Sequence, residues 1–458
     1  MKIAVIGGGT AGYIAAAHLT KYFPQFELYH IYDSRIPTIG VGEGTTPNFP
    51  TWLTDITGLY YPKLKDRCKI TLKYGIFFEN WGVKYKQFMH NLYPISETYA
   101  YHISADKIVE LLQDYISATH IDKKVIDLKS NGVAVDIVFE DNTYLKTDIA
   151  IDARGFPKSL DENHHIKLSL IPTNAALIRQ CPEGNKSIIN FKIENQVLQY
   201  NSATRTVARP HGWIFVIPLT HRTSYGYVYN SSINSVAEIA ADFDEFLRLE
   251  EVTTVGQDRK IHFPNFTHRT LFDGALFKLG NAASFLEPLE ATAIGVILMQ
   301  MLYFSHWPLE HLSKNSKRAE LNPKNIEVFN RFLLKKIYRL SVFVGWHYSM
   351  GSSFDTEFWR FAQSNFHQEI KKLEYQDVKC EFETYIQAGS KLPHSIKNYQ
   401  QFSMIAAKIN EEKEAAKIES ATRKSRFFSF FPPESFAEIG YGINYFPEVK
   451  ALSKDGYR

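Results

Sequence analysis

The apolar and polar positions at the start of the chain predict a strand, a tight turn and a helix. The run Ile3–Ile6 is apolar throughout and has the length of a short buried strand. Good helix formers begin at Ala15–Leu19, where three alanines precede a leucine. Between the two segments stand glycines in G-x-G-x-x-G spacing, at Gly7, Gly9 and Gly12.

This glycine turn is typical of proteins that bind the pyrophosphate of a dinucleotide. Gly7 permits the tight turn, Gly9 lets the backbone approach the phosphates, and Gly12 lets the helix pack closely on the strand. The first N–H groups of the helix are then available to the anion. A second strand, Phe26–Tyr32, ends at Asp33, about 20 residues past the last glycine, where an acid accepts hydrogen bonds from an adenosine ribose. A structural turn with a chance aspartate is the alternative.

The pattern along the rest of the chain predicts a mixed α/β protein. A helix is expected over Ser104–Ser117, and hairpin strands are expected over 123–151. Residues 165–265 alternate like a sheet, Leu271–Tyr303 returns to a strand and then a helix, and the remainder is mainly helical.

Composition describes a globular protein without a strong electrostatic bias. The 458 residues are 45% hydrophobic and 22% charged, and the net charge of +3 gives no reason to expect nucleic acid or a membrane as a partner. The longest apolar stretch, Ala293–Phe304, is too short to span a bilayer. Cys68, Cys181 and Cys380 have no metal-ligand spacing and favour a reducing compartment, so we expect a cytoplasmic protein without a metal.

A later segment would also pass close to a bound cofactor. Phe277–Glu287 combines a short apolar run with Gly280 and small residues, which would let a cofactor chain approach the backbone. Asn281 follows this glycine and can hydrogen-bond a ribityl chain. We expect the next helix to begin near Pro288, a favourable first-turn residue.

Several motifs spread over most of the chain together resemble the flavin-dependent tryptophan halogenase family. No single motif is specific to the family, but the combination is. The motifs are Gly7-Gly-Gly-Thr-Ala-Gly12, Ile39-Gly-Val-Gly-Glu-Gly-Thr-Thr-Pro47, Leu72-Lys-Tyr-Gly-Ile-Phe-Phe-Glu-Asn-Trp81, Ala100-Tyr-His102, Gly212-Trp-Ile-Phe-Val-Ile-Pro-Leu219, Gly226-Tyr-Val-Tyr229, Phe285-Leu-Glu-Pro-Leu-Glu-Ala-Thr-Ala-Ile294, His347-Tyr348 and Phe358-Trp359.

The resemblance implies a Rossmann-type FAD-binding fold like that of flavoprotein monooxygenases, and an enzyme that uses FADH2, O2 and a halide. Residues 1–308 would form the FAD-binding and halogenase core, with a β-sheet substrate region inserted at about 165–265. Residues 309–458 would form a mainly helical region that covers the substrate pocket. The residues expected to contact the cofactor are Gly7, Gly9, Thr10, Ala11, Gly12, Asp33, Gly42, Glu43, Gly280 and Asn281.

The implied reaction is halogenation of an electron-rich aromatic compound, such as an indole or a phenol, by hypohalous acid. By the resemblance, Lys73 holds or captures the halogen, and Glu290 assists delivery and removes the ring proton. Lys73 alternates with Leu72 and Tyr74 on an expected strand Ile70–Phe78, and a lysine facing an enclosed channel would be desolvated and more nucleophilic. A solvent-facing lysine, and a carboxylate that only complements a helix dipole, are the alternatives.

The resemblance places the halide at the amides of Thr292 and Ala293, at a helix N-terminus. Ala291 stands where the family commonly has serine, which removes a hydroxyl donor. Because chloride needs such donors most when it leaves water, we expect bromide or iodide to be used at least as well as chloride.

Trp213, Phe215 and Pro218 would line the substrate channel, with Phe215 in place of the family's second tryptophan. The sequence does not reveal the tyrosine-and-glutamate cluster that holds the amino-acid end of free tryptophan. The predicted substrate is therefore a small electron-rich aromatic compound in general.

One dinucleotide fingerprint, without a second for a nicotinamide cofactor, predicts a separate flavin reductase as partner. Homo-oligomerisation stays open. Two other functions stay open as well. One is an aromatic hydroxylase that reduces its own flavin with NADPH, and the other is a non-catalytic flavin-binding protein.

Overall fold

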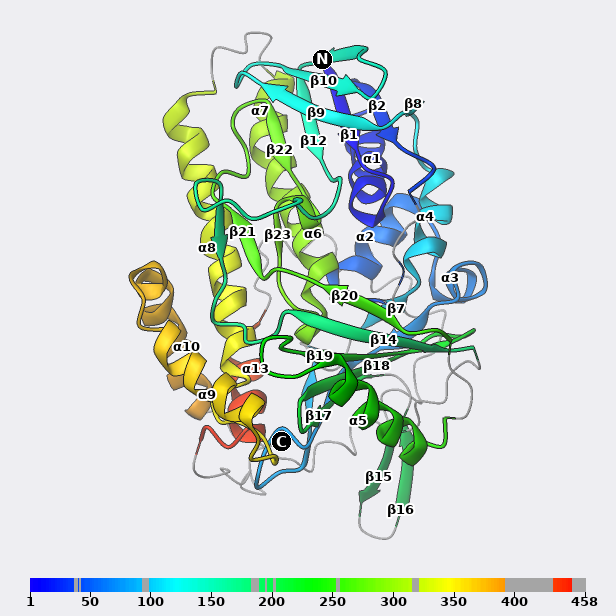
Figure 1. The fold of residues 1–458 in the computed structure, drawn as a ribbon. Coiled ribbons are helices and arrows are strands. Elements are labelled where there is room, and N and C mark those ends of the chain that lie inside the picture. Colours follow the sequence, from blue (N-terminus) through cyan, green and yellow to red (C-terminus); the bar gives the residue numbers. More distant parts are fainter. Residues whose placement is uncertain are drawn as a thin grey trace, which may run out of the picture. The chain divides into compact units, whose positions relative to one another are not determined.

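A computed structural model (Figure 1) describes residues 1–36, 40, 43–92, 99–182, 189–193, 196–200, 203–252, 256–314, 321–391 and 431–446. Gly42, a predicted cofactor residue, lies outside these residues. The chain divides into two compact units of three segments each. Unit 1 comprises Met1–Leu59, Ile103–Leu168 and Asn265–Ile337, and unit 2 comprises Tyr60–His102, Ser169–Pro264 and Tyr338–Arg458. The division does not fall at residue 308, because segments of the two units alternate along the chain.

Unit 1 contains a five-stranded parallel sheet in the order β22-β12-β1-β2-β8. The strands are β1 (Lys2–Ile6), β2 (Glu27–Tyr32), β8 (Thr119–Asp122), β12 (Ile149–Asp152) and β22 (Leu276–Lys278). The helix α1 (Thr10–Tyr22) follows β1, so the predicted strand–turn–helix unit is confirmed. The chain continues to β2 on one side of β1 and returns to β12 on the other. The carboxyl end of β1 is therefore the switch point at which such sheets bind ligands.

A second, antiparallel layer packs against this sheet. It consists of β9 (Val125–Ser130), β10 (Val135–Phe139) and β11 (Tyr144–Thr147), which confirms the hairpin strands predicted over 123–151. Apolar side chains from both layers form one buried cluster: Ala4, Ile6, Ile31, Val135, Ile137, Phe139, Ala150 and Ala275.

Short elements complete unit 1. The predicted helix over 104–117 is present but shorter, as α4 (Ala105–Gln113). A small antiparallel sheet and two 3-10 turns precede the apolar helix α6, and α8 continues into unit 2. The bounds are β3 (Glu43–Gly44), α2 (Asn48–Thr57), β13 (His165–Lys167), β21 (Phe266–His268), β23 (Ser284–Phe285), the turns Gly280–Ala282 and Leu289–Ala291, α6 (Thr292–Phe304), a π-helix Ser305–Leu309, α7 (Glu310–Lys314) and α8 (Pro323–Trp346).

Unit 2 is organised by a seven-stranded sheet in the order β20-β14-β19-β18-β17-β5-β6. Only β17 and β5 are parallel neighbours in it. The strands are β5 (Gly75–Glu79), β6 (Gln87–Asn91), β14 (Ala175–Cys181), β17 (Thr204–Arg209), β18 (Gly212–Pro218), β19 (Thr223–Tyr229) and β20 (Arg259–His262). The sheet predicted over 165–265 is thus present, together with a helix that its alternation did not predict.

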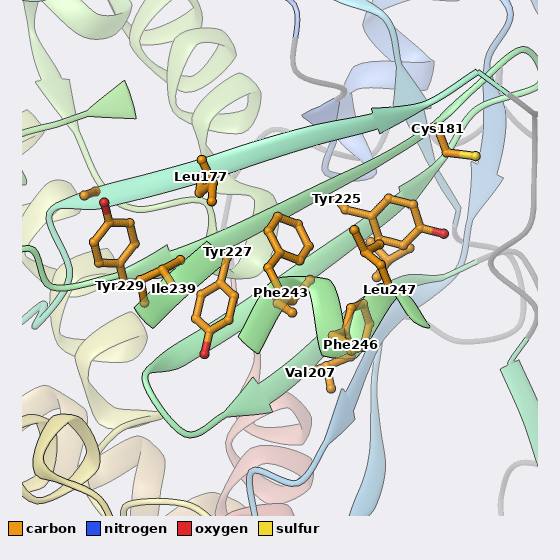
Figure 2. Close-up of a cluster of buried hydrophobic side chains, with 13 residues drawn as sticks. Leu177, Cys181, Val207, Tyr225, Tyr227, Tyr229, Ile239, Phe243, Phe246 and Leu247 are labelled. Carbon is orange, nitrogen blue, oxygen red and sulfur yellow. The ribbon is translucent and has the colours of Figure 1, made fainter. Parts of the chain in front are cut away.

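That helix, α5 (Val236–Leu249), covers one face of the sheet (Figure 2). It begins with a capping box formed by Ser235 and Glu238, which satisfies N–H groups that would otherwise lack partners. Phe243 of α5 packs edge-on against Tyr227 of β19, with ring centroids 5.8 Å apart. Aromatic packing of this kind fixes the helix on the sheet and leaves the opposite face for other contacts.

A buried arginine joins the same helix to the sheet. Arg205 of β17 is 5% exposed and contacts Glu79 of β5 at 2.7 Å and Glu250, directly after α5, at 2.5 Å.

The other elements of unit 2 are α3 (Tyr61–Cys68), β4 (Thr71–Lys73), β7 (Ala100–Ile103), β15 (Ile189–Ile193), β16 (Gln196–Tyr200), α9 (Glu357–Glu369), the turn Leu373–Tyr375, α10 (Gln376–Lys391) and α13 (Pro433–Gly442).

Candidate active site

The glycine turn closes tightly at the carboxyl end of β1. Gly7 has a φ of +145°, and a Cβ there would overlap the carbonyl of Ala153 at the end of β12. A Cβ at Gly12 would overlap the carbonyl oxygen of Gly7. Gly9 is the N-cap of α1 and carries no side chain. The first backbone amides of the helix, which include those of Thr10 and Ala11, are therefore not capped by a side chain. The turn therefore has the geometry of a phosphate cradle.

Asp33 follows β2 at the edge where an adenosine ribose would bind. Its side chain is 8% exposed, and Arg35 donates to both carboxylate oxygens, at 2.7 and 2.9 Å. These hydrogen bonds hold the pKa of Asp33 below its usual value, so the group is an ionised acceptor at neutral pH. Arg35 also contacts Glu140 at 2.6 Å. The sequence analysis missed Arg35, although its position two residues after the acid was a usable signal. Glu43 lies in β3 of unit 1.

A small pocket brings two predicted groups of residues together in unit 1. Gly280 and Asn281 line it beside Thr292 and Ala293, although the sequence separates the two pairs. The pocket volume of about 10 Å³ is close to what one water molecule needs. The remaining lining residues are Ser284, Phe285, Leu286 and Val296.

Gly280 joins this pocket to the glycine turn. Its φ is +60°, and a Cβ there would lie 2.8 Å from the Cβ of Ala11 in the first turn of α1. The N–H of Gly280 donates to Oε1 of Gln300 at 3.3 Å, and Gln300 is fully buried in α6. Gln300 is a polar residue within an otherwise apolar helix, and this was a sequence signal for the contact that the sequence analysis missed.

The segment before α6 differs from the prediction. The helix was expected to begin near Pro288, but it begins at Thr292, after the turn Leu289–Ala291. Glu290 and Ala291 both have left-handed backbones, with φ of +67° and +53°. Such conformations cost about 1–3 kcal/mol each in residues other than glycine, and they cluster at functional sites. Glu290 is 4% exposed, so the turn holds its carboxylate in a largely enclosed position just before the helix.

Ala291 is the N-cap of α6 and supplies no capping side chain to the first amides of that helix. Serine or threonine at this position commonly accepts a hydrogen bond from these N–H groups. An anion in the pocket beside Thr292 and Ala293 would satisfy them instead.

Lys73 lies in unit 2, at the end of β4, where it pairs with Ala100 of β7. The single strand predicted over 70–78 is wrong: Tyr74 separates β4 from β5, and the two strands belong to different sheets. Lys73 is only 1% exposed. Lysine is almost never fully buried in proteins without a specific partner or role, so the solvent-facing alternative does not hold.

A chain of hydrogen bonds runs beside Lys73. Thr204 of β17 and Thr71 of β4 contact the two ring nitrogens of His102, at 2.9 and 3.0 Å, and Thr71 donates to the carbonyl of Pro218 at 2.6 Å. Since the Thr71 hydroxyl donates to Pro218, it accepts from Nδ1 of His102, and Nε2 accepts from Thr204. Burial, and then the charge of Lys73, hold the pKa of His102 well below its usual value, so the imidazole is neutral. The sequence analysis quoted His102 in a motif but gave it no role.

The predicted channel residues Trp213 and Phe215 lie on the face of the large sheet that points away from α5, because strand residues alternate between faces. The indole N–H of Trp213 donates to the hydroxyl of Tyr348 at 2.8 Å. The ring of Phe215 lies over Gly226 of β19, where a Cβ would overlap it. Both side chains therefore belong to a closely packed aromatic wall, and Pro218 at the end of the same strand contacts Thr71 as described above.

Each predicted catalytic residue is thus fixed within its own unit, Lys73 in unit 2 and Glu290 in unit 1. Among the described residues, no group of three or more His, Cys, Asp or Glu side chains could hold a metal ion. In the same part of the chain, no helix is both long and apolar enough to cross a membrane.

Comparison with known proteins places these features in context. The sequence model of the tryptophan halogenase family matches residues 2–97 and 94–453. The tryptophan 7-halogenase RebH of Lentzea aerocolonigenes is 24% identical over 433 residues, covering 78% of each chain. The crystal structure of the tryptophan 6-halogenase SttH of Streptomyces toxytricini is 19% identical, with a TM-score of 0.69 over 96% of this chain and 89% of that one. The flavin-dependent halogenase BrvH of Brevundimonas sp. BAL3 is 18% identical, with a TM-score of 0.66 over 97% and 96%.

Proposed function

Because the chain belongs to the tryptophan halogenase family, we propose that it halogenates an electron-rich aromatic compound, such as an indole or a phenol, with Lys73 and Glu290 as catalytic residues. The protein is an oxidoreductase, and the family's chemistry uses FAD, O2 and a halide. When bound, reduced FAD supplies hypohalous acid from O2 and the halide. A separate flavin reductase would reduce the FAD.

The residues of unit 1 fit the shape and charge of FAD. The cradle made by Gly7, Gly9 and the first amides of α1 suits the pyrophosphate, and a Cβ at Gly7 or Gly12 would overlap the backbone carbonyls that shape it. Asp33 is held as an ionised acceptor for the adenosine ribose. Gly280 packs on Ala11 of α1, which supports a role for the adjacent Asn281 in holding the ribityl chain. These contacts support FAD as the cofactor.

The small pocket at the start of α6 suits a halide. It has space for one ion or molecule of about the size of water, and no side chain caps the amides of Thr292 and Ala293. The positive end of the helix dipole favours an anion there. Since Ala291 has no hydroxyl group, the pocket supplies few hydrogen-bond donors to a strongly hydrated ion such as chloride. We therefore expect bromide or iodide to be used at least as well as chloride.

The burial of Lys73 is the observation that carries the proposal. An enclosed amine can take the halogen of hypohalous acid, which forms an N–halogen bond and releases water. Transfer to the ring then breaks this bond and forms a carbon–halogen bond. The ring proton goes to the carboxylate of Glu290, and the Lys73 nitrogen takes a proton from water. A lysine that only holds the acid by hydrogen bonding would still place it for the same substitution.

The test is product analysis with purified protein, FAD, NADH, a flavin reductase, O2, each halide and a panel of indoles and phenols. A halogenated product that depends on all components supports the proposal. A hydroxylated product, or flavin reduction without the reductase, would favour the hydroxylase alternative, and a protein that binds FAD without any product would favour the non-catalytic one.

Two pairs of variants test the residue roles. Lys73→Met should abolish product while FAD binding survives, whereas Lys86→Met, an exposed lysine of the same unit, should behave as wild type. Glu290→Gln should lower turnover by about 10²–10⁴-fold, the usual contribution of a positioned base. The control is Glu327→Gln, at an exposed position of α8. Near-normal turnover in either test variant would contradict its assigned role.

A competition assay tests the halide proposal. With equal chloride, bromide and iodide, brominated or iodinated product should equal or exceed chlorinated product, after subtraction of product formed by leaked peroxide. Ala291→Ser would restore a hydroxyl donor and should shift the ratio toward chloride. An excess of chlorinated product in wild type would contradict the proposal.

A further inference from the structure

A buried histidine lies directly beneath the glycine turn and has no role in the functions described so far. His30 is on β2, is fully buried, and its Nε2 lies 3.0 Å from the carbonyl oxygen of Gly7. A carbonyl is only an acceptor, so Nε2 carries the proton and donates it to Gly7. The other ring nitrogen, Nδ1, is also buried and has no hydrogen-bond partner among the described residues. The whole polar interaction of this side chain is therefore made with the turn.

Aromatic neighbours fix the plane of the His30 ring. Tyr13 of α1 meets it edge-on, with centroids 4.7 Å apart and an interplanar angle of 88°. Tyr32 of β2 and His120 of β8 also contact the ring, with centroids at 5.1 and 5.6 Å. These three are also the titratable groups that contact His30. Burial lowers the pKa of His30 to about 4, so the ring stays neutral at physiological pH.

The hydrogen bond acts on the most flexible peptide of the turn. Three consecutive glycines, Gly7, Gly8 and Gly9, give this backbone more freedom than any other triplet of residues. In a trans peptide, the carbonyl of one residue and the N–H of the next point in opposite directions. Because His30 holds the Gly7 carbonyl, it also fixes the direction of the Gly8 N–H in the same peptide.

The opposite side of the carbonyl is also closed. Gly12 of α1 lies so near the Gly7 oxygen that a Cβ there would overlap it. The carbonyl is thus held between the bare Cα of Gly12 and the imidazole of His30. Without the imidazole, the Gly7 carbonyl would lose the hydrogen bond that holds it in this orientation.

We propose that His30 is a positioning residue for the cofactor: its Nε2–H fixes the Gly7–Gly8 peptide and thereby the shape of the turn that receives the pyrophosphate of FAD. The proposal rests on the proposed binding of FAD at this turn. An apolar strand residue of similar size would fill the same space but would leave the turn free to rearrange.

The test measures FAD affinity of the purified apoprotein by flavin fluorescence, together with its thermal midpoint. His30→Leu keeps the volume but removes the donor, and it should raise the FAD Kd about tenfold, which corresponds to one net hydrogen bond. His30→Gln retains an N–H donor and should bind within about threefold of wild type by the same scale. Tyr29→Phe, on the same strand, loses only an exposed hydroxyl contact with Glu27 and serves as the control.

The outcomes separate positioning from simple packing. If His30→Leu binds FAD as wild type does, or if His30→Leu and His30→Gln lose affinity equally, the proposal is overturned. If His30→Leu does not fold, His30→Asn replaces it, since its shorter amide cannot span the distance to Gly7, and the same comparison with His30→Gln applies. Failure of the wild-type protein to bind FAD would instead contradict the proposed function itself.

Discussion

Buried neutral histidines make the stability of unit 1 sensitive to mild acid. His18 of α1 is 2% exposed, with Nε2 at 2.9 Å from the hydroxyl of Ser305, while the indole N–H of Trp52 donates to Nδ1 at 3.3 Å. Burial, and then the charge of His306, lower the pKa of His18 from 6.5 to about 3. Burial likewise lowers the pKa of His30 to about 4.

The direction and size of the effect follow from proton linkage. Between the folded and unfolded pKa values the unfolded chain binds more protons, so stability falls as the pH falls below 6.5. Each pH unit in this window costs about 1.4 kcal/mol per histidine. At pH 5, His18 and His30 would each remove about 2 kcal/mol from the free energy of unfolding, against a typical total of about 5–15 kcal/mol. His268 has its pKa lowered by burial as well and acts in the same direction.

The window between pH 7.5 and 5 isolates the histidines. Carboxylates whose pKa values are lowered, such as Asp33 by its hydrogen bonds with Arg35, lose their contribution only near and below the unfolded value of 3.8. Thermal unfolding of the apoprotein should therefore show a fall of the midpoint across this range, at about 1 °C per kcal/mol for a chain of 458 residues.

His18→Gln is the decisive comparison. It keeps a donor toward Ser305 but cannot titrate, so it should reduce the loss between pH 7.5 and 5 by about 2 kcal/mol, or about 2 °C, whatever its stability at pH 7.5. A midpoint that does not change with pH in wild type, or an unchanged loss in His18→Gln, would refute the reasoning.

Three further predictions follow from close contacts. Gly12→Ala should abolish FAD binding, measured by fluorescence titration, because its Cβ would overlap the Gly7 carbonyl; retained affinity would show that the turn can widen. Arg205→Met should destabilise the protein in urea unfolding by about 3–5 kcal/mol, because two glutamates would lose their buried partner; the exposed control Arg360→Met should change stability by less than about 0.5 kcal/mol. Gly226→Ala should change product yield or regioselectivity while FAD affinity is kept, because the Phe215 ring must move, and unchanged products in the same assay would contradict a channel role for Phe215.

The sequence predicts the first layer of the fold well because local physics determines it. The segment from Ile3 to Gly12 requires glycines for steric reasons that hold in any chain, and the structure confirms the resulting strand, turn and helix. The apolar alternation over 123–151 and 165–265 likewise identifies strands. It does not identify which strands pair, since β17 and β5 are far apart in the sequence.

The errors fall where backbone strain or tertiary contacts override local preference. Pro288 favours a helix start, but the left-handed backbones of Glu290 and Ala291 delay it to Thr292. The run from Ile70 to Phe78 has the pattern of one strand, yet it divides at Tyr74 between two sheets. Arg35 and Gln300 each carried a signal in the sequence, whereas the role of His102 depends on contacts that no spacing rule describes.

The hydrogen-bond chain beside Lys73 has a consequence for the path of protons. A conducting chain needs members that can each accept a proton and pass another on. The chain from Thr204 through His102 and Thr71 ends at the carbonyl of Pro218, which has no proton to give up. This chain therefore cannot relay a proton beyond Pro218, and its role is to hold β4 and β7 in place. In the proposed reaction, the proton lost by the aromatic ring must therefore leave by another route. That route begins at the carboxylate of Glu290.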